Sequence, residues 1–457
     1  IIKVLLLRTA VKKMIRKSGN KPRTIRNNNL KLMLNLYGLH NALSVSEISA
    51  KINLSRTTVS KINEKLLALN LVTACGKGDS TGEGGKKPEL YCLNMRFGHI
   101  ICFHIIEGYI NVKIFDLSLT VIFKEKILTS EDEPLENIIS IIGNRVKKYL
   151  SADQQSGYAK LLGISVAVHG IVDSEKGICY IAPHFPSWGS NRNIKEMIIE
   201  KIGPAISVHV ESWIRFKAYS AKIEGDDPVY KNYILLDAGQ HGIVSGVVIN
   251  GELFSGHHYL SGEIGHTIVS AFDTQQCYCG GHGCLETFID CKRLVQKAVS
   301  LKNKYPVSLI FKNTQNNQNN QNNQNNQNNQ NNQNNQNNQN NQNNQNNQKP
   351  DIFDIFKASN KNDELACLLM DEIAGWFAIG LSNVFLMFDP EVIYFEGDYS
   401  NAGEYFVQKL NEKINDVSLN RLEKNFRIVF QDSRHSMTML GAAAFARDYY
   451  LFNKIEA

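Results

Sequence analysis

The stretch from Gly262 to Glu286 restricts the fold of this chain more than any other feature of its sequence. Three cysteines and one histidine fall within nineteen residues of it: His266, Cys277, Cys279 and Cys284. Thiolate and imidazole are the ligands that tetrahedral zinc prefers, and three cysteines with one histidine form a recurrent closed ligand set. Glycines on both sides of His282 allow the backbone to turn back and bring the third sulfur to the metal. We therefore predict a structural zinc site, with a metal-free cysteine-rich turn as the alternative.

The residues around these ligands resemble the signature of the ROK family, which groups repressors, open reading frames and sugar kinases. That signature reads Gly-Glu-x-Gly-His and then Cys-x-Cys-Gly-x-x-Gly-Cys-x-Glu, and every position of it is present between Gly262 and Glu286. The resemblance implies an α/β protein with the two-lobed, actin-like ATPase (ribonuclease-H-like) fold and a cleft between the lobes.

The positive charge of the chain is concentrated at one end. Residues 1–95 carry 17 Lys/Arg and 5 Asp/Glu, whereas the net charge of all 457 residues is only +6. A basic module on an acidic body predicts a polyanionic partner for the first part alone. The cysteines outside the metal set show no disulfide framework, which is typical of a cytoplasmic protein. The most apolar run, Ile373–Phe388, is too short to span a bilayer and is expected to be a buried helix, so we predict no membrane partner.

Residues 29–66 carry the pattern of three short helices. Leucines give the first helix, Asn29–Tyr37, a buried face. Ser44 and Glu47 form a capping box that begins the second helix. Ser55 follows a turn and caps a third helix, whose apolar side chains are Val59, Ile62 and Leu66. The pattern fits a helix-turn-helix, and an ordinary three-helix scaffold is the alternative.

The third helix leaves short polar and basic side chains exposed, as reading of base edges in the major groove requires. They are Ser55, Arg56, Thr57, Thr58, Ser60 and Lys61. Two short strands over 71–73 and 89–94 flank a basic, glycine-rich segment, which predicts a wing that contacts DNA through Gly85, Lys86 and Lys87. The run Gly-Gly-Lys-Lys-Pro-Glu-Leu-Tyr also resembles the wing of ROK repressors. Double-stranded operator DNA is therefore the predicted partner.

The remainder of the chain reads as a mixed sheet covered by helices. Strands over 100–106, 109–116 and 121–127 form a meander, a helix follows over 135–150, and strands and helices then alternate. Three antiparallel strands followed by this alternation fit an α/β fold with helices on the sheet.

We predict three parts in the chain. They are a basic lead-in over 1–27, a winged helix-turn-helix domain over 28–94 and a ROK domain over 97–457. Within the ROK domain we expect a first lobe over about 97–211, a second lobe over about 212–436 and a C-terminal helix over 437–453. The Gln-Asn-Asn repeat at 315–348 has no apolar side chain to bury and is predicted to be a disordered surface loop.

Three elements that a ROK sugar kinase needs are altered here. The first phosphate loop reads Phe-His-Ile-Ile-Glu-Gly over 103–108, which is bulky and anionic where phosphate requires small residues. The second phosphate loop, over 238–246, keeps only scattered glycines. The Asn-Asp pair of the family is replaced by Ser212 and Trp213, and an indole cannot act as a general base. The three changes together predict that the protein is not an enzyme.

Side chains that contact sugars in the family are partly retained. Glu263, His266 and Glu286 match residues that hydrogen-bond sugar hydroxyls, and His266 is expected both to ligate zinc and to meet the effector. The alternative for the two glutamates is support of the metal ligands. His184 takes the place of a family asparagine and is a candidate donor to a hydroxyl. Trp188 is either a stacking surface for a sugar or part of the core.

Three hypotheses follow for the function. The first is a transcriptional repressor of carbohydrate-utilisation genes that is released by a sugar or sugar derivative. The second is a sugar kinase that carries a DNA-binding domain, and the altered phosphate loops and Trp213 favour the first over it. The third is a regulator controlled by a protein partner. The resemblance also implies a homodimer or homotetramer.

Overall fold

The computed structural model describes residues 29–456, except residues 31, 35, 39, 41, 80–86, 157–159, 225–229, 241, 274, 312–348, 418–426 and 432–436. The predicted lead-in, the Gln-Asn-Asn repeat, Gly85 and Lys86 therefore lie outside the described residues. Contacts divide the chain into two compact units. Unit 1 comprises the chain up to Lys231, Gly246–Leu260 and the segment from Ser436 onward, and unit 2 comprises Asn232–Ser245 and Ser261–His435.

The N-terminal part of unit 1 is built from helices and a small sheet. Residues 29–38 are helical where described, and α3 (Val45–Ile52) and α4 (Arg56–Ala68) follow. The sheet has the order β1-β3-β2, from β1 (Leu43–Ser44), β2 (Val72–Lys77) and β3 (Glu89–Leu93). The predicted caps are confirmed, because Ser44 and Glu47 form a capping box and Ser55 accepts a hydrogen bond from the Thr58 amide. Strand β1 was not predicted, since two residues carry no readable alternation.

The turn between α3 and α4 depends on one residue in a left-handed conformation. Asn53 caps the C-terminus of α3 with φ of 55°. Asparagine tolerates this region better than other residues with a β-carbon, because its short amide bonds to nearby backbone. Helix α4 is then held against the first helix by a buried hydrogen bond, in which the Tyr37 hydroxyl donates to Asn63 Oδ1 at 2.6 Å.

A five-stranded sheet forms the rest of unit 1, with the order β11-β7-β4-β5-β6. Its strands are β4 (Gly98–Ile106), β5 (Tyr109–Phe115), β6 (Val121–Leu128), β7 (Lys160–Val168) and β11 (Val208–Ser212). Strands β4, β5 and β6 are antiparallel neighbours, as the predicted meander requires, whereas β4, β7 and β11 run parallel. The carboxyl ends of β4, β7 and β11 therefore meet at one edge of the sheet.

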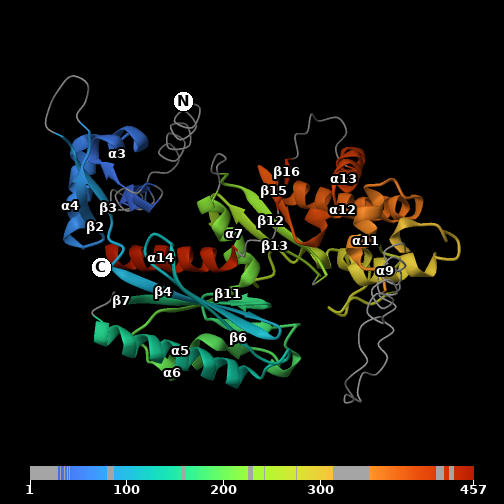
Figure 1. Cartoon of the computed structure of the whole chain (residues 1–457), viewed down its shortest axis with the longest axis horizontal. Helices are drawn as coiled ribbons and strands as arrows, with labels where there is room; N and C mark the ends of the chain where they lie inside the picture. Colours follow the sequence, from blue (N-terminus) through green and yellow to red (C-terminus); the bar gives the residue numbers. More distant parts are fainter. Residues whose placement is uncertain are drawn as a thin grey trace, which may run out of the picture. The chain divides into compact units, whose positions relative to one another are not determined.

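Helices cover both faces of this sheet (Figure 1). They are α5 (Leu135–Ser156) and α6 (Ile194–Ile202) on one face, and α7 (Trp213–Glu224) and α14 (Thr438–Glu456) on the other. A small sheet of β8 (Ile171–Asp173), β9 (Ile178–Ile181) and β10 (Arg192–Asn193) and the short helix η1 (Pro186–Trp188) complete the unit. Asp173 ends β8.

Unit 2 contains a second sheet, whose strands run in the order β13-β12-β15-β16. They are β12 (Tyr233–Gly239), β13 (Gly242–Ile249), β15 (Val392–Glu396) and β16 (Ile428–Phe430). The end of β13 lies in unit 1 and pairs there with β14 (Glu252–Leu253). The helices of unit 2 are α8 (Leu285–Ile289), α9 (Cys291–Ser300), α11 (Ile352–Ser359), α12 (Glu364–Phe388) and α13 (Glu404–Val417), with the single turns η2 (Ile264–His266), η3 (Leu309–Phe311) and η4 (Asp398–Asn401).

Helix α12 is the most apolar helix of the described chain. By length and composition alone it is able to cross a membrane. Its side chains Leu369, Ile373, Phe377 and Leu381 are, however, almost completely buried inside the protein. A core helix explains the same composition, which agrees with the buried helix predicted for Ile373–Phe388.

The boundary predicted between the two lobes, at residue 211, does not coincide with the division between the units. Helix α7 stays with unit 1 because it packs on α14 over the first sheet. The two helices approach so closely that a β-carbon at Gly441 would lie 1.7 Å from the Phe216 carbonyl oxygen. The C-terminal helix thus belongs to unit 1, although the chain reaches it only after passing through unit 2.

Candidate functional site

The four predicted metal ligands converge in unit 2. One ligand atom from each of His266, Cys277, Cys279 and Cys284 lies within 4.8 Å of all the others. The Cys279 and Cys284 sulfurs are 3.7 Å apart, and the Cys277 sulfur is 3.6 Å from His266 Nδ1. A tetrahedral zinc ion with its usual bond lengths would separate two sulfurs by about 3.8 Å, and sulfur from nitrogen by about 3.6 Å. The cluster therefore fits a tetrahedral metal ion.

The backbone of the loop brings these ligands together through a tight reversal. Gly283 has φ of 74°, and a β-carbon there would lie 1.8 Å from the Ser270 carbonyl oxygen. Short bridges pair Gln276 with His282 and Ile268 with Cys284, which closes the loop on both sides. Only glycine satisfies both the positive φ and the close approach at residue 283.

The thiols of the cluster sit in environments that differ. Backbone hydrogen bonding from Gly281 lowers the pKa of Cys279, whereas burial raises the pKa of Cys284 to about 12. A buried thiol loses its proton readily only when a positive charge compensates the thiolate, and a metal ion supplies that charge. The donor chemistry therefore agrees with the distances.

The His266 ring is oriented through both of its nitrogens. Nδ1 faces the Cys277 sulfur, and Nε2 lies 3.0 Å from the Tyr278 hydroxyl. A hydrogen bond at the nitrogen that does not bind metal commonly fixes the tautomer and the ring plane of a ligating histidine. Tyr278 was not singled out from the sequence, because its contact with His266 depends on how the loop folds.

The two predicted sugar-binding glutamates lie beside the metal ligands in unit 2. Glu263 precedes η2, and Glu286 lies in α8, where its Oε2 accepts a hydrogen bond from the Ile243 amide at 3.5 Å. Burial raises the pKa of Glu286 to about 7, and the nearby carboxylates of Asp290 and Glu263 add to the shift. Carboxylates placed in this way are suited to accept hydrogen bonds from hydroxyl groups.

His184 and Trp188 lie in unit 1, whereas the metal ligands and the two glutamates lie in unit 2. His184 Nδ1 is 3.1 Å from the Glu107 carboxylate, and its side chain is part-exposed. Trp188 is 1% exposed, stacks on Phe185 and donates its indole hydrogen to the Glu133 carbonyl. Of the two interpretations of Trp188, packing in the core is therefore confirmed.

A stack of three rings lies at the carboxyl ends of β4, β7 and β11, where ligands commonly bind in open α/β sheets. His104 and His169 approach through their Nε2 atoms at 3.0 Å with nearly coplanar rings. Trp213 lies parallel to His169, with ring centroids 4.8 Å apart. Burial, followed by the charges of Lys217 and Lys113, lowers the pKa of His104 to about 3. Sequence reasoning missed this stack, because only the order of the strands brings the three residues together.

The two segments that replace the kinase phosphate loops are a tight turn in unit 1 and a loop in unit 2 whose backbone donor is already bonded. The first is a two-residue turn at Glu107 and Gly108, since Ile106 pairs with Tyr109. In the second, the Gln240 amide donates to Asp398 Oδ2 at 2.8 Å. The Asp398 carboxylate thus accepts a hydrogen bond from a backbone N–H that, in a phosphate-binding loop, would bind the phosphate.

The candidate DNA-contacting residues lie at the start of α4. Arg56, Thr57 and Lys61 are exposed, whereas Thr58 and Ser60 are half-buried. The exposed Ser55 is engaged locally, because its hydroxyl also lies within 3 Å of the Thr57 and Thr58 hydroxyls. Lys87 is exposed on the β3 side of the predicted wing.

Comparison with known proteins decides the family. The ROK family matches residues 101–449. The chain belongs to the ROK family. It is 25% identical over 409 residues to the xylose repressor of Caldicellulosiruptor bescii, covering 88% of this chain and 91% of that protein. It is 22% identical over 422 residues to the DNA-binding transcriptional dual regulator NagC of Escherichia coli K12, covering 91% and 90%.

A solved structure also covers nearly the whole chain. It is a ROK family transcriptional regulator described as a homolog of the Escherichia coli MLC protein, and it aligns with a TM-score of 0.72 at 18% identity. The alignment covers 95% of this chain and 100% of that one, so the two proteins share a fold. The α/β fold class expected from the sequence is thereby confirmed.

Proposed function

We propose that this ROK protein is a DNA-binding transcriptional repressor of carbohydrate-utilisation genes, released by a sugar or sugar derivative in the cytoplasm. The observation that carries the proposal is the basic N-terminal module, in which α4 presents Arg56 and Lys61 to solvent after a helix-turn-helix turn. The likeness to repressors and regulators along nearly the whole chain supports it.

In this proposal residues 28–94 form a winged helix that reads duplex DNA. Residues Ser55–Lys61 at the start of α4 enter the major groove, and the wing with Gly85, Lys86 and Lys87 contacts the minor groove or phosphates. Ser55 contributes mainly as the cap that holds the helix start. A homodimer or homotetramer would place two such modules on a pseudo-palindromic operator.

The metal site in this proposal holds one structural zinc ion. His266, Cys277, Cys279 and Cys284 fill all four positions, so the ion offers no open position for a substrate. Zinc supplies binding energy that orders the loop before α8. It thereby fixes Glu286, which follows the last cysteine by two residues.

Glu263, Glu286 and His266 of unit 2 would bind hydroxyl groups of the effector, and His184 of unit 1 is a separate candidate donor. Hydroxyl-rich ligands gain affinity and specificity when carboxylates pair with them, because analogues that leave a buried carboxylate unpaired are rejected. Phosphoryl transfer is not part of the proposal. Trp213 in place of an aspartate, the Glu107 turn and the Asp398 contact to Gln240 all support its absence.

Binding of the full-length protein to duplexes selected from a random library, followed by fluorescence anisotropy, tests this function. Arg56→Ala should weaken binding by about 1–3 kcal/mol and relax the sequence preference at one position. Lys87→Ala should weaken binding to all duplexes and lower the salt slope by about 0.9. Lys148→Ala, an exposed change on α5, is the control and should leave both quantities unchanged.

The outcomes distinguish the three hypotheses. Failure to select any duplex at low salt refutes a DNA-binding function. Release of DNA by one or more sugars in a broad panel supports the repressor. ATP turnover that depends on a sugar and is lost in Glu263→Gln would instead favour a kinase. DNA binding that no sugar changes would favour control by a protein partner.

A further inference from the structure

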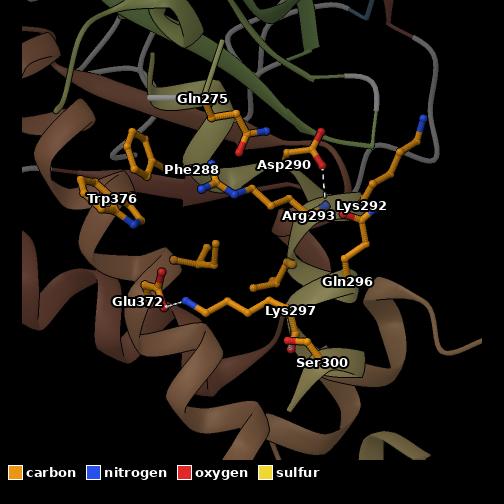
Figure 2. A pocket seen from close by; sticks show the side chains of 12 residues that line it. Gln275, Phe288, Asp290, Lys292, Arg293, Gln296, Lys297, Ser300, Glu372 and Trp376 are labelled. Carbon is orange, nitrogen blue, oxygen red and sulfur yellow. Dashed lines mark hydrogen bonds and ion pairs between the residues drawn. The ribbon is translucent and has the colours of Figure 1, made fainter. Parts of the chain in front are cut away.

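A hollow in unit 2 lies between α9 and α12, and none of the four metal ligands lines it (Figure 2). Its volume is about 740 Å³, which falls within the range of small-molecule sites. Phe288 of α8 lies against it, whereas Glu286 contacts Gly242 and Gly265. Residues two apart on a helix project about 200° from each other, so the hollow and the Glu286 carboxylate lie on opposite sides of α8.

One wall of the hollow is aromatic and carries a hydrogen-bond donor that the protein does not use. The rings of Phe288 and Trp376 stack with centroids 4.0 Å apart. Trp376 Nε1 is buried and has no partner among the described residues, and Figure 2 shows it turned toward the hollow. An unpaired buried donor costs about 1–3 kcal/mol, and a ligand acceptor would remove that cost.

The opposite wall, on α9, is positively charged. Arg293 lies with its guanidinium carbon 5.6 Å from the Phe288 ring centre and uses Nη1 to donate to the Thr287 carbonyl. A guanidinium has five N–H donors, so most of its capacity is left for a ligand. Lys292, the preceding residue, is exposed, and Figure 2 shows its side chain pointing away from the hollow, so Arg293 is the cation that faces a ligand there.

The acidic residues of the hollow are already engaged. Asp290 caps α9 by accepting the Arg293 amide hydrogen at 2.6 Å, and Glu372 forms an ion pair with Lys297. Apart from the amides of Gln275 and Gln296, the groups that remain are the Arg293 guanidinium and the Trp376 N–H beside an aromatic surface. Such a surface complements a ligand that brings acceptors, negative charge and a flat or apolar ring.

We propose that this hollow is a second small-molecule site, which binds an anion carried on a ring. Arg293 holds the anionic group, Trp376 donates to one of its oxygens, and the ring packs on Phe288 and Trp376. The proposal does not depend on the repressor function, because neither the DNA module nor the metal centre contributes a residue.

Phenyl phosphate is the probe, because it joins one phosphate to one flat ring. Trp376 is one of three tryptophans in the chain, so saturable quenching of tryptophan fluorescence reports binding and should be absent in Trp376→Phe. Calorimetry should show that this variant still binds, about tenfold more weakly, since one hydrogen bond to a charged group is lost. Inorganic phosphate lacks the ring and phenol lacks the charge, and each should bind at least tenfold more weakly than phenyl phosphate.

Substitutions on the basic wall complete the test. Arg293→Met should weaken binding of phenyl phosphate about tenfold or more, as expected for a hydrogen bond to a charged group. Arg293→Lys keeps the charge but loses the planar fork of donors, and it serves if Arg293→Met does not fold. Lys302→Met is the control, because Lys302 lies over Phe311 outside the hollow. The proposal is overturned if the wild type shows no saturable binding, or if Arg293→Met and Arg293→Lys both bind as the wild type does.

Discussion

Replacing His104 by glutamine should make the stability of unit 1 less sensitive to acid. Burial lowers the pKa of this imidazole to about 3, and the positive charges of Lys217 and Lys113 contribute further. Glutamine places its amide nitrogen near the position of Nε2, so it retains a donor toward His169 without a group that titrates between pH 3 and 7.

The sign and size of the effect follow from proton binding in the two states. The pKa of histidine in the unfolded chain is about 6.5, so between pH 3 and 6.5 the unfolded state binds more protons than the folded state. The contribution of neutral His104 to the unfolding free energy is therefore fully present above about pH 6.5 and declines as the pH falls below that value. Between pH 7 and pH 5 the loss amounts to about 2 kcal/mol of unfolding free energy.

Urea unfolding of the full chain at pH 7, 6 and 5 measures this difference. The wild type should lose about 2 kcal/mol more than His104→Gln over this interval, whereas titrating groups common to both proteins cancel. His257→Gln removes an exposed imidazole and should follow the wild type. If His104→Gln and the wild type differ by less than about 0.5 kcal/mol in their change with pH, the buried neutral imidazole is not the cause of acid sensitivity.

Three further changes test other parts of the structure. Cys279→Ser should abolish binding of about one zinc ion per chain, measured by metal analysis after dialysis, and full occupancy in the variant would contradict the ligand assignment. Tyr37→Phe should lower the unfolding free energy by about 1–3 kcal/mol in urea titrations, because the buried Asn63 oxygen loses its donor at 2.6 Å. Arg215→Met should lower the unfolding free energy by about 3–5 kcal/mol, because it leaves the Glu211 carboxylate without its ion-pair partner in the core. Adding Glu211→Gln to Arg215→Met should recover part of this loss. Equal stability of the single and the double variant would argue against the ion pair.

Local sequence signals accounted for most of the elements. Ser44 with Glu47 and Ser55 marked the starts of α3 and α4 correctly, because a cap acts within one helical turn. The strand limits of the meander agree to within about two residues, since alternation and turn residues are also local. Strand β1 escaped notice because its two residues become a strand only through pairing with β3.

The candidate sites were predictable to the extent that their residues are close in sequence. Cys277, Cys279 and Cys284 lie on one loop, so their spacing alone indicated that they converge. Tyr278 as the partner of His266 depends on the fold of that loop and gave no sequence signal. The contact between His104 and His169 joins two strands whose order in the sheet was unknown from the sequence.

The packing of unit 1 bears on how an effector signal would reach DNA. One hydrophobic core contains Leu30 and Ile48 of the N-terminal module, Ile100 of β4 and Met439 of α14. A core is close-packed, so elements that share one move together and not as bodies joined by a tether. If an effector favours one arrangement of this protein, the N-terminal module and the sheet of unit 1 would thus have to move together. The change that the effector causes in the free energy of operator binding is set by the difference in effector affinity between the two arrangements. No flexible linker within unit 1 is needed to transmit this change.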